Sequence, residues 1–162
     1  MLTDLGALPV PPEGHLGFRG HALQSFRFLI DEYGFEVAES SPISVRFISD
    51  AIFAMLSYSP ECPMDSILVG TGNGEEMPAS GFILDDFAYM DRGGILFAYD
   101  RFDLRDKVGV AKFLETAASL LRGCGGSVLK GEVEALRSLQ IKADEREQAY
   151  IRMMERGNSA QG

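Results

Sequence analysis

Aspartates are concentrated in the middle of the chain, where closely spaced carboxylates could bind a hard cation or act as general acids and bases. They are Asp85, Asp86, Asp91, Asp100, Asp103 and Asp106. Their spacing does not fit the EF-hand loop, in which calcium ligands alternate around a central glycine and the last ligand is a glutamate. We therefore interpret the segment as a solvated or partner-binding face, and we expect neither a metal nor a cofactor.

The two histidines, His15 and His21, both lie near the N-terminus. Nucleophilic catalysis would need a histidine beside a nucleophile and an orienting acid, and the chain has no Gly-x-Ser-x-Gly turn to present a nucleophile. We therefore expect a protein that is not an enzyme. The alternative is a small enzyme or ligand-binding domain that combines one histidine with the acidic segment from Asp85 to Asp106.

A glycine-rich stretch from Gly70 to Glu76 invites comparison with phosphate-binding loops. Such a loop needs a Gly-Lys-Ser/Thr sequence at a helix start, so that lysine meets the phosphates. Glu75 and Glu76 stand there instead and would repel them. The sequence predicts a flexible acidic loop and argues against a nucleotide site.

The two cysteines, Cys62 and Cys124, are far apart and form no CxxC motif. Neither a zinc site nor a redox motif is indicated. One disulfide is an open alternative, but two reduced thiols fit a reducing compartment better.

The charge of the chain is strongly negative and uneven. There are 15 basic and 24 acidic residues, for a net charge of −9, and residues 1–106 hold 17 of the acids but only six bases, all arginine. A field of this sign repels nucleic acid and anionic lipid, and it would steer a basic protein toward the surface. Solubility alone is the simpler explanation, and composition does not separate the two.

The clearest element is an amphipathic helix from about His21 to Tyr33, whose apolar residues recur at steps of three and four. Gly34 is placed to end this helix in the left-handed conformation, with Phe35 folding back on Ile30. This boundary is the best defined in the sequence.

Four short segments with alternating or continuous apolar residues come next and predict strands. They span residues 35–39, 43–48, 51–58 and 66–69. The joints are short and rich in turn residues, which favours antiparallel neighbours because parallel strands need long crossovers. We expect a meander with a central third strand and with one face packed against the first helix.

Residues 82–90 and 95–102 are rich in aromatics and ambiguous between short helices and strands; a short helix is favoured for the first. A helix with Asp106 as its N-cap and Gly123 as its stop is clearer. Another helix is expected from about Glu132 toward Met154, with a solvated or frayed end.

The length suits one α+β domain over residues 1–156, in which residues 1–20 form a Pro/Gly-rich arm, followed by a disordered tail over residues 157–162. The longest apolar run, residues 51–56, is far shorter than the roughly 20 residues of a membrane-spanning helix. The N-terminus does not read as a secretory signal, so we expect a cytoplasmic protein with no membrane contact.

The order of these elements resembles small α+β immunity-type proteins that are encoded beside polymorphic or contact-dependent toxins in bacteria. The resemblance spans about residues 21–140. The matching segments are Phe28-Leu29-Ile30-Asp31-Glu32-Tyr33-Gly34-Phe35, Val45-Arg46-Phe47-Ile48-Ser49, Ile67-Leu68-Val69-Gly70, the helix from Phe113 to Arg122, and Val128-Leu129-Lys130-Gly131-Glu132. The N-terminal arm and residues 82–106 do not match.

The resemblance implies stoichiometric binding of a cognate toxin domain in the cytoplasm, without catalysis. A basic nuclease is one such partner, because an acidic inhibitor can occupy a cleft that otherwise holds nucleic acid. The alternative from charge alone is an acidic regulator of a nucleic-acid enzyme. We expect no direct contact with nucleic acid.

The acids that follow the last expected strand are the candidates for partner recognition. They lie beside glycines or aromatics in the part of the chain that holds most of the negative charge. These candidates are Glu75, Glu76, Asp85, Asp86 and Asp91.

Overall fold

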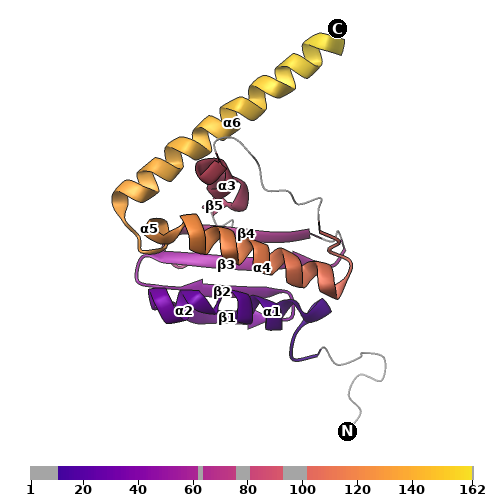
Figure 1. Cartoon of the computed structure of the whole chain (residues 1–162), viewed down its shortest axis with the longest axis vertical. Helices are drawn as coiled ribbons and strands as arrows, with labels where there is room; N and C mark the ends of the chain where they lie inside the picture. Colours follow the sequence, from indigo (N-terminus) through magenta and orange to yellow (C-terminus); the bar gives the residue numbers. More distant parts are fainter. Residues whose placement is uncertain (1–10, 62–63, 76–80, 93–101, 162) are drawn as a thin grey trace.

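The computed structural model describes residues 11–61, 64–75, 81–92 and 102–161 and has an α+β fold, as the sequence predicts. A short 3₁₀ turn, η1 (His15–Gly17), leads into helices α1 (Phe18–Ser25) and α2 (Arg27–Tyr33). An antiparallel sheet and then further helices follow (Figure 1).

The sheet is a meander in which each strand pairs with the next one along the chain. Its strands are β1 (Glu36–Ser41), β2 (Ser44–Ile48), β3 (Ile52–Ser59), β4 (Met64–Thr71) and β5 (Phe82–Ile83). The four expected strands and the central place of the third are confirmed. A fifth strand of two residues lies within the segment that was expected to be a short helix, immediately before that helix.

Helices α1, α2 and α4 (Lys107–Cys124) lie together on one face of the sheet (Figure 1). Register explains which side chains meet them: Phe47 stands opposite Ala54, which stands opposite Val69, and all three are buried. Rings and aliphatic side chains from the helices complete one hydrophobic core. They include Phe18, Phe26, Leu29, Phe113, Leu114 and Leu121.

The first helix is interrupted at Phe26, where the sequence predicted one continuous helix. Phe26 has φ −100° and ψ 14°, outside the helical range. In an unbroken helix, residues two apart point in nearly opposite directions, so Phe26 and Phe28 could not both face the core. The break allows both rings to be buried, with centroids 6.0 Å apart.

Gly34 ends α2 as predicted, with φ 71° and ψ 22°. Its N–H donates to the carbonyl oxygen of Ile30 at 3.2 Å, and the N–H of Phe35 donates to that of Leu29 at 2.9 Å. Phe35 is buried, whereas Ile30 is 39% exposed. The left-handed conformation of Gly34 therefore allows two of the last carbonyl groups of α2 to accept hydrogen bonds, and it directs the chain into β1.

Helix α4 begins after Asp106, as expected, although the Asp106 side chain makes no capping hydrogen bond. The expected stop at Gly123 is wrong, because the helix continues to Cys124. Gly125 follows the helix, and its N–H donates a hydrogen bond to the carbonyl oxygen of Leu121 at 2.7 Å. Gly123 lies within the helix, and the residue at its C-cap is Gly125, with φ −94° and ψ 4°.

The last part of the chain is helical. Helix α3 (Leu84–Arg92) lies beside β5, α5 (Gly126–Leu129) follows α4, and α6 (Val133–Gln161) leaves the body of the molecule at an angle (Figure 1). Residues 157–161, expected to be disordered, belong to α6. No helix in the described ranges is both long enough and apolar enough to span a membrane.

Candidate partner-binding surface

One face of the sheet is left without a helix in the described part of the chain, since α1, α2 and α4 cover the other face and α3 and α6 lie beyond the β5 edge (Figure 1). We call this side the open sheet face. Strand register arranges its residues in ranks across the strands. The first rank contains Glu36, Ile48, Phe53 and Gly70. The middle rank contains Glu39, Arg46, Met55, Leu68 and Ile83, and the third contains Ser41, Ser44, Ser57 and Ser66.

The middle rank combines charge at one end with apolar side chains at the other. Met55, Leu68 and Ile83 are half-buried neighbours on β3, β4 and β5. Beside them the guanidinium of Arg46 lies 3.5 Å from a carboxylate oxygen of Glu39. This is a hydrophobic centre with a charged rim, the composition of many protein–protein interfaces.

A bulge in β1 brings Glu36 to the same face as Glu39. Residues three apart in a regular strand point to opposite faces, because side chains alternate. The pairing shifts register between Val37 and Glu39, so one extra residue is accommodated there. Glu36 and Glu39 are therefore both directed to the open sheet face and exposed.

The loop after β4 folds over this face and contributes a third carboxylate. Gly74 lies against the ring of Phe53, so closely that an added Cβ would stand 2.8 Å from a ring carbon, and Phe53 is buried as a result. Arg46 donates to the carbonyl oxygen of Asn73 at 2.5 Å and lies 4.0 Å from the carboxylate of Glu75. Two acids, Glu39 and Glu75, thus lie within 4.0 Å of one arginine whose side chain is only 11% exposed, and Glu36 is the third acid on this face.

The third rank is polar and flat. Four serines stand in register across β1, β2, β3 and β4. Their small hydroxyl side chains leave room for another backbone to approach, and each can donate and accept a hydrogen bond. The open sheet face therefore offers apolar, acidic and hydrogen-bonding strips side by side.

The five predicted partner-binding acids do not form one surface. Glu75 lies at the rim of the open sheet face, whereas Asp85 and Asp91 belong to α3, beyond the β5 edge. Asp85 is half-buried and Asp91 is exposed. Glu76 lies outside the described residues.

Asp86 has a structural position that the sequence prediction missed. It is only 3% exposed, and one carboxylate oxygen accepts a hydrogen bond from the N–H of Ile83 at 2.9 Å. The other oxygen accepts from Nε of Arg146 on α6 at 2.8 Å. Asp86 caps the start of α3 and ties α3 to α6, so its charge cannot lie at the rim of an interface.

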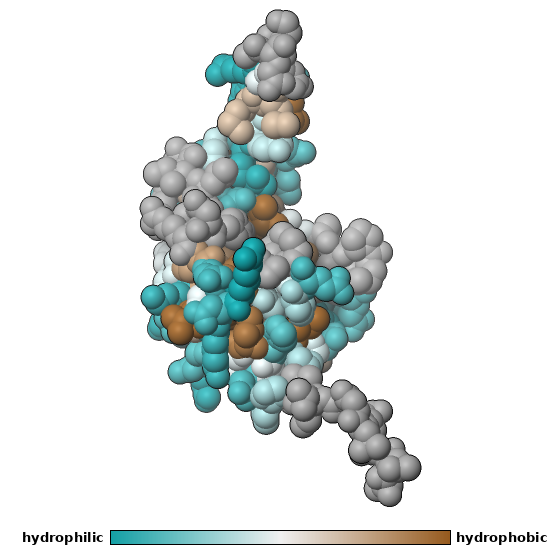
Figure 2. Space-filling model, turned by 90° about the vertical axis from the view of Figure 1, so that its right-hand side faces the viewer, coloured by the Kyte–Doolittle hydropathy of each residue, from teal (hydrophilic) through white to brown (hydrophobic). Residues whose placement is uncertain are grey.

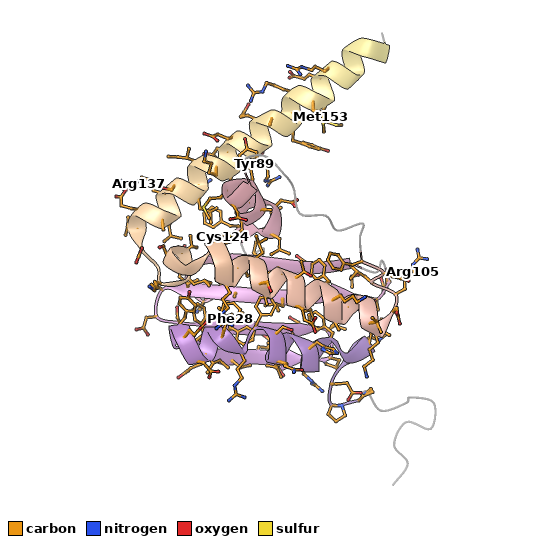
Figure 3. All side chains as sticks on the ribbon, in the orientation of Figure 1. Phe28, Tyr89, Arg105, Cys124, Arg137 and Met153 are labelled. Atoms are coloured by element: carbon orange, nitrogen blue, oxygen red, sulfur yellow. The ribbon has the colours of Figure 1, made fainter. Side chains whose placement is uncertain are left out.

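Two hollows in the described part of the chain are lined by charged side chains. A groove of about 420 Å³ runs between α2 and α4, and Phe28 is one of its lining residues (Figure 3). In this groove Arg122 pairs with Glu32 at 2.6 Å and lies over the ring of Phe28. A cleft of about 680 Å³ separates the end of β4 from α6 and contains the Asp86–Arg146 pair. Arg27 also pairs with Asp31 in the groove, and neither hollow is lined by a histidine.

Two aspartates of the acidic segment, Asp86 and Asp106, lie at opposite ends of α4. Asp86 and Phe87 lie near the C-terminal end of α4, since Phe87 contacts Cys124 and Gly125, whereas Asp106 precedes its first residue. Eighteen helical residues separate these ends, about 27 Å. Among the residues the structure describes, no three metal-ligating side chains come together. Cys62, the second cysteine, lies outside the described residues.

The comparisons with known proteins found no family model, curated protein or solved structure that matches this chain.

Proposed function

We propose that this protein is an immunity-type protein that neutralises a cognate toxin domain by stoichiometric contact through the open sheet face. One observation carries the proposal: apolar Met55, Leu68 and Ile83 lie next to an acidic rim in which Glu36, Glu39 and Glu75 outnumber Arg46. Apolar side chains supply the contact energy of such an interface, and like-signed rim charges select an oppositely charged partner.

The acidic rim favours a basic protein surface as the partner. A nuclease cleft that holds a phosphate backbone has the required sign, and carboxylates can meet its lysines and arginines in place of phosphates. The same surface would serve an acidic regulator of a nucleic-acid enzyme. The identity of the protein encoded beside this gene distinguishes the two.

The proposal is tested by growth rescue. The toxin domain encoded next to this gene is expressed from an inducible promoter in a host that carries the wild-type chain or a variant. We expect the wild type to restore growth and Glu36→Lys/Glu39→Lys to reduce rescue strongly, because two rim charges then repel a basic partner.

The control variant is Asp31→Lys/Glu115→Lys. These two acids are exposed on α2 and α4, on the opposite side of the sheet, and the change in net charge is the same. It should rescue growth as well as the wild type does. Failure of the wild-type chain to rescue would contradict the immunity function, whereas equal loss in both variants would contradict the open sheet face as the contact surface.

A further inference from the structure

The second half of α6 extends beyond the body of the molecule (Figure 1). Every residue from Glu147 to Gly157 is exposed, and the helix projects away from the sheet and the other helices (Figure 1). At 1.5 Å per residue, the part from Glu147 to Gln161 is about 22 Å long. Figure 3 shows Met153 on this part, far from Arg137 near the start of the helix.

The apolar stripe that anchors α6 continues along the projecting half. Its members follow one another at alternating steps of three and four residues, the spacing of a two-helix seam. They are Leu136, Leu139, Ala143, Arg146, Tyr150 and Met153, of which only Arg146 is charged. The first four face α3 and the body, with Leu139 buried and Arg146 bonded to Asp86, whereas Tyr150 and Met153 are 54% and 61% exposed.

Met154 flanks the same stripe and is 50% exposed. Apolar side chains gather on this projecting part in the space-filling view (Figure 2). A helix of this length is marginal in water without an apolar face packed against something. Continuity with the buried seam indicates that the partner is another helix.

The charge of α6 points to a second copy of this chain as that helix. The five acidic and five basic residues of Val133–Gln161 cancel, so the whole net charge of −9 resides in the rest of the chain. A surface that meets itself across a two-fold axis must not carry one sign of charge, because like charges would face each other. The acidic rim of the open sheet face is complementary to the basic partner proposed above. The neutral α6 can pack against a second copy of itself without charge repulsion.

We infer that the projecting halves of α6 from two copies pack against each other in an antiparallel pair, with Tyr150 of each copy against Met153 of the other. The antiparallel direction follows from charge: it puts the two acidic bodies at opposite ends of the pair, whereas a parallel pair would bring them together. The two helices cross at Tyr150 and Met153 and do not overlap along their full length, because α3 already covers the same face of α6 at Arg146. The contact is therefore small, and the expected dissociation constant lies between about 1 and 100 μM.

Sedimentation of the full chain between about 1 and 300 μM tests the inference. The wild type should shift from monomer to dimer over this range. Met153→Glu should weaken dimerisation at least about tenfold, since it puts a charge into the seam. Gln148→Glu adds the same charge at an exposed position off the stripe and should change the dissociation constant by less than about threefold.

A cross-linking experiment tests the direction. Chains with Tyr150→Cys and chains with Met153→Cys are mixed under mild oxidation, with the wild type as the background for the native cysteines. The mixed disulfide should form in higher yield than either like pair. A chain that stays monomeric at 300 μM, or equal effects of Met153→Glu and Gln148→Glu, would overturn the dimer, and preferential like pairs would overturn the antiparallel direction.

Discussion

At the scale of single residues, two glycines surrounded by open space should respond to alanine in opposite directions. An added Cβ meets no atom within 4 Å at Gly34 or at Gly123, so packing does not decide the outcome at either site. Gly34 has φ 71°, where a Cβ is strained, and Gly34→Ala should lower the free energy of unfolding by about 1 kcal/mol. Gly123 is helical, and Gly123→Ala should raise it by up to about 1 kcal/mol.

Urea denaturation of the three chains measures both changes. The signs are the test, because a general effect of alanine on the unfolded chain would move both in the same direction. If Gly34→Ala were as stable as the wild type, the left-handed cap would be wrong, and with it the turn that leads from α2 into β1.

The burial of Asp86 could not be predicted from residue type alone. Asp85 and Asp86 are adjacent and chemically identical, yet the first is half-buried and the second is inside the molecule. One signal was present: Asp86 is three residues after Ile83, the spacing at which an acid bonds the N–H that precedes a helix. Its partner Arg146 is 60 residues away, and no local pattern indicates that pairing.

At the scale of elements, the Asp86–Arg146 pair holds α6 against α3. Removing one partner of a buried ion pair leaves an unpaired buried charge, and Arg146 is still 24% exposed, which reduces the cost. We expect Asp86→Ala to lower the free energy of unfolding by about 2–4 kcal/mol. A double-mutant cycle with Arg146→Ala should give a coupling of about 1–3 kcal/mol.

The matched control is the Glu134–Arg137 pair on the surface of the same helix, at 3.1 Å but largely exposed on both sides. Its coupling should be about 0.5 kcal/mol or less. Equal couplings for the two pairs would mean that Asp86 and Arg146 do not anchor α6.

The elements were predictable to the extent that local chemistry determines them. Alternating residues in β2 and β3 and short turns between strands give an antiparallel meander, and the helical stripe of α4 is unambiguous. The break at Phe26 and the bulge after Val37 were not predictable, because both depend on which face the fold buries. The candidate surface depends on that bulge, so the acids predicted from the sequence include Glu75 of this surface but not Glu36 and Glu39.

At the scale of the whole molecule, the acidic and the charge-balanced parts of the sequence form different parts of the fold. The acid-rich first part of the chain forms the sheet and its rim, and the charge-balanced end forms the projecting helix. Reversing the charges of Asp85 and Asp86 would disturb the contact between α3 and α6, so a loss of binding in such a variant would not show that these acids contact a partner. Glu36 and Glu39 are exposed and suitable for that purpose.

The most direct test of the proposed recognition is the association rate constant with the expected partner, a toxin domain encoded beside this gene, measured by stopped flow at about 50 and 300 mM salt. Rim charges act mainly on the encounter rate, and screening strengthens over this range. The wild type should associate fast at low salt and at least about tenfold more slowly at high salt. At low salt Glu36→Lys/Glu39→Lys should lose most of that rate, and Asp31→Lys/Glu115→Lys should keep it within about twofold. A rate indifferent to salt, or lowered equally by both variants, would contradict recognition through the open sheet face.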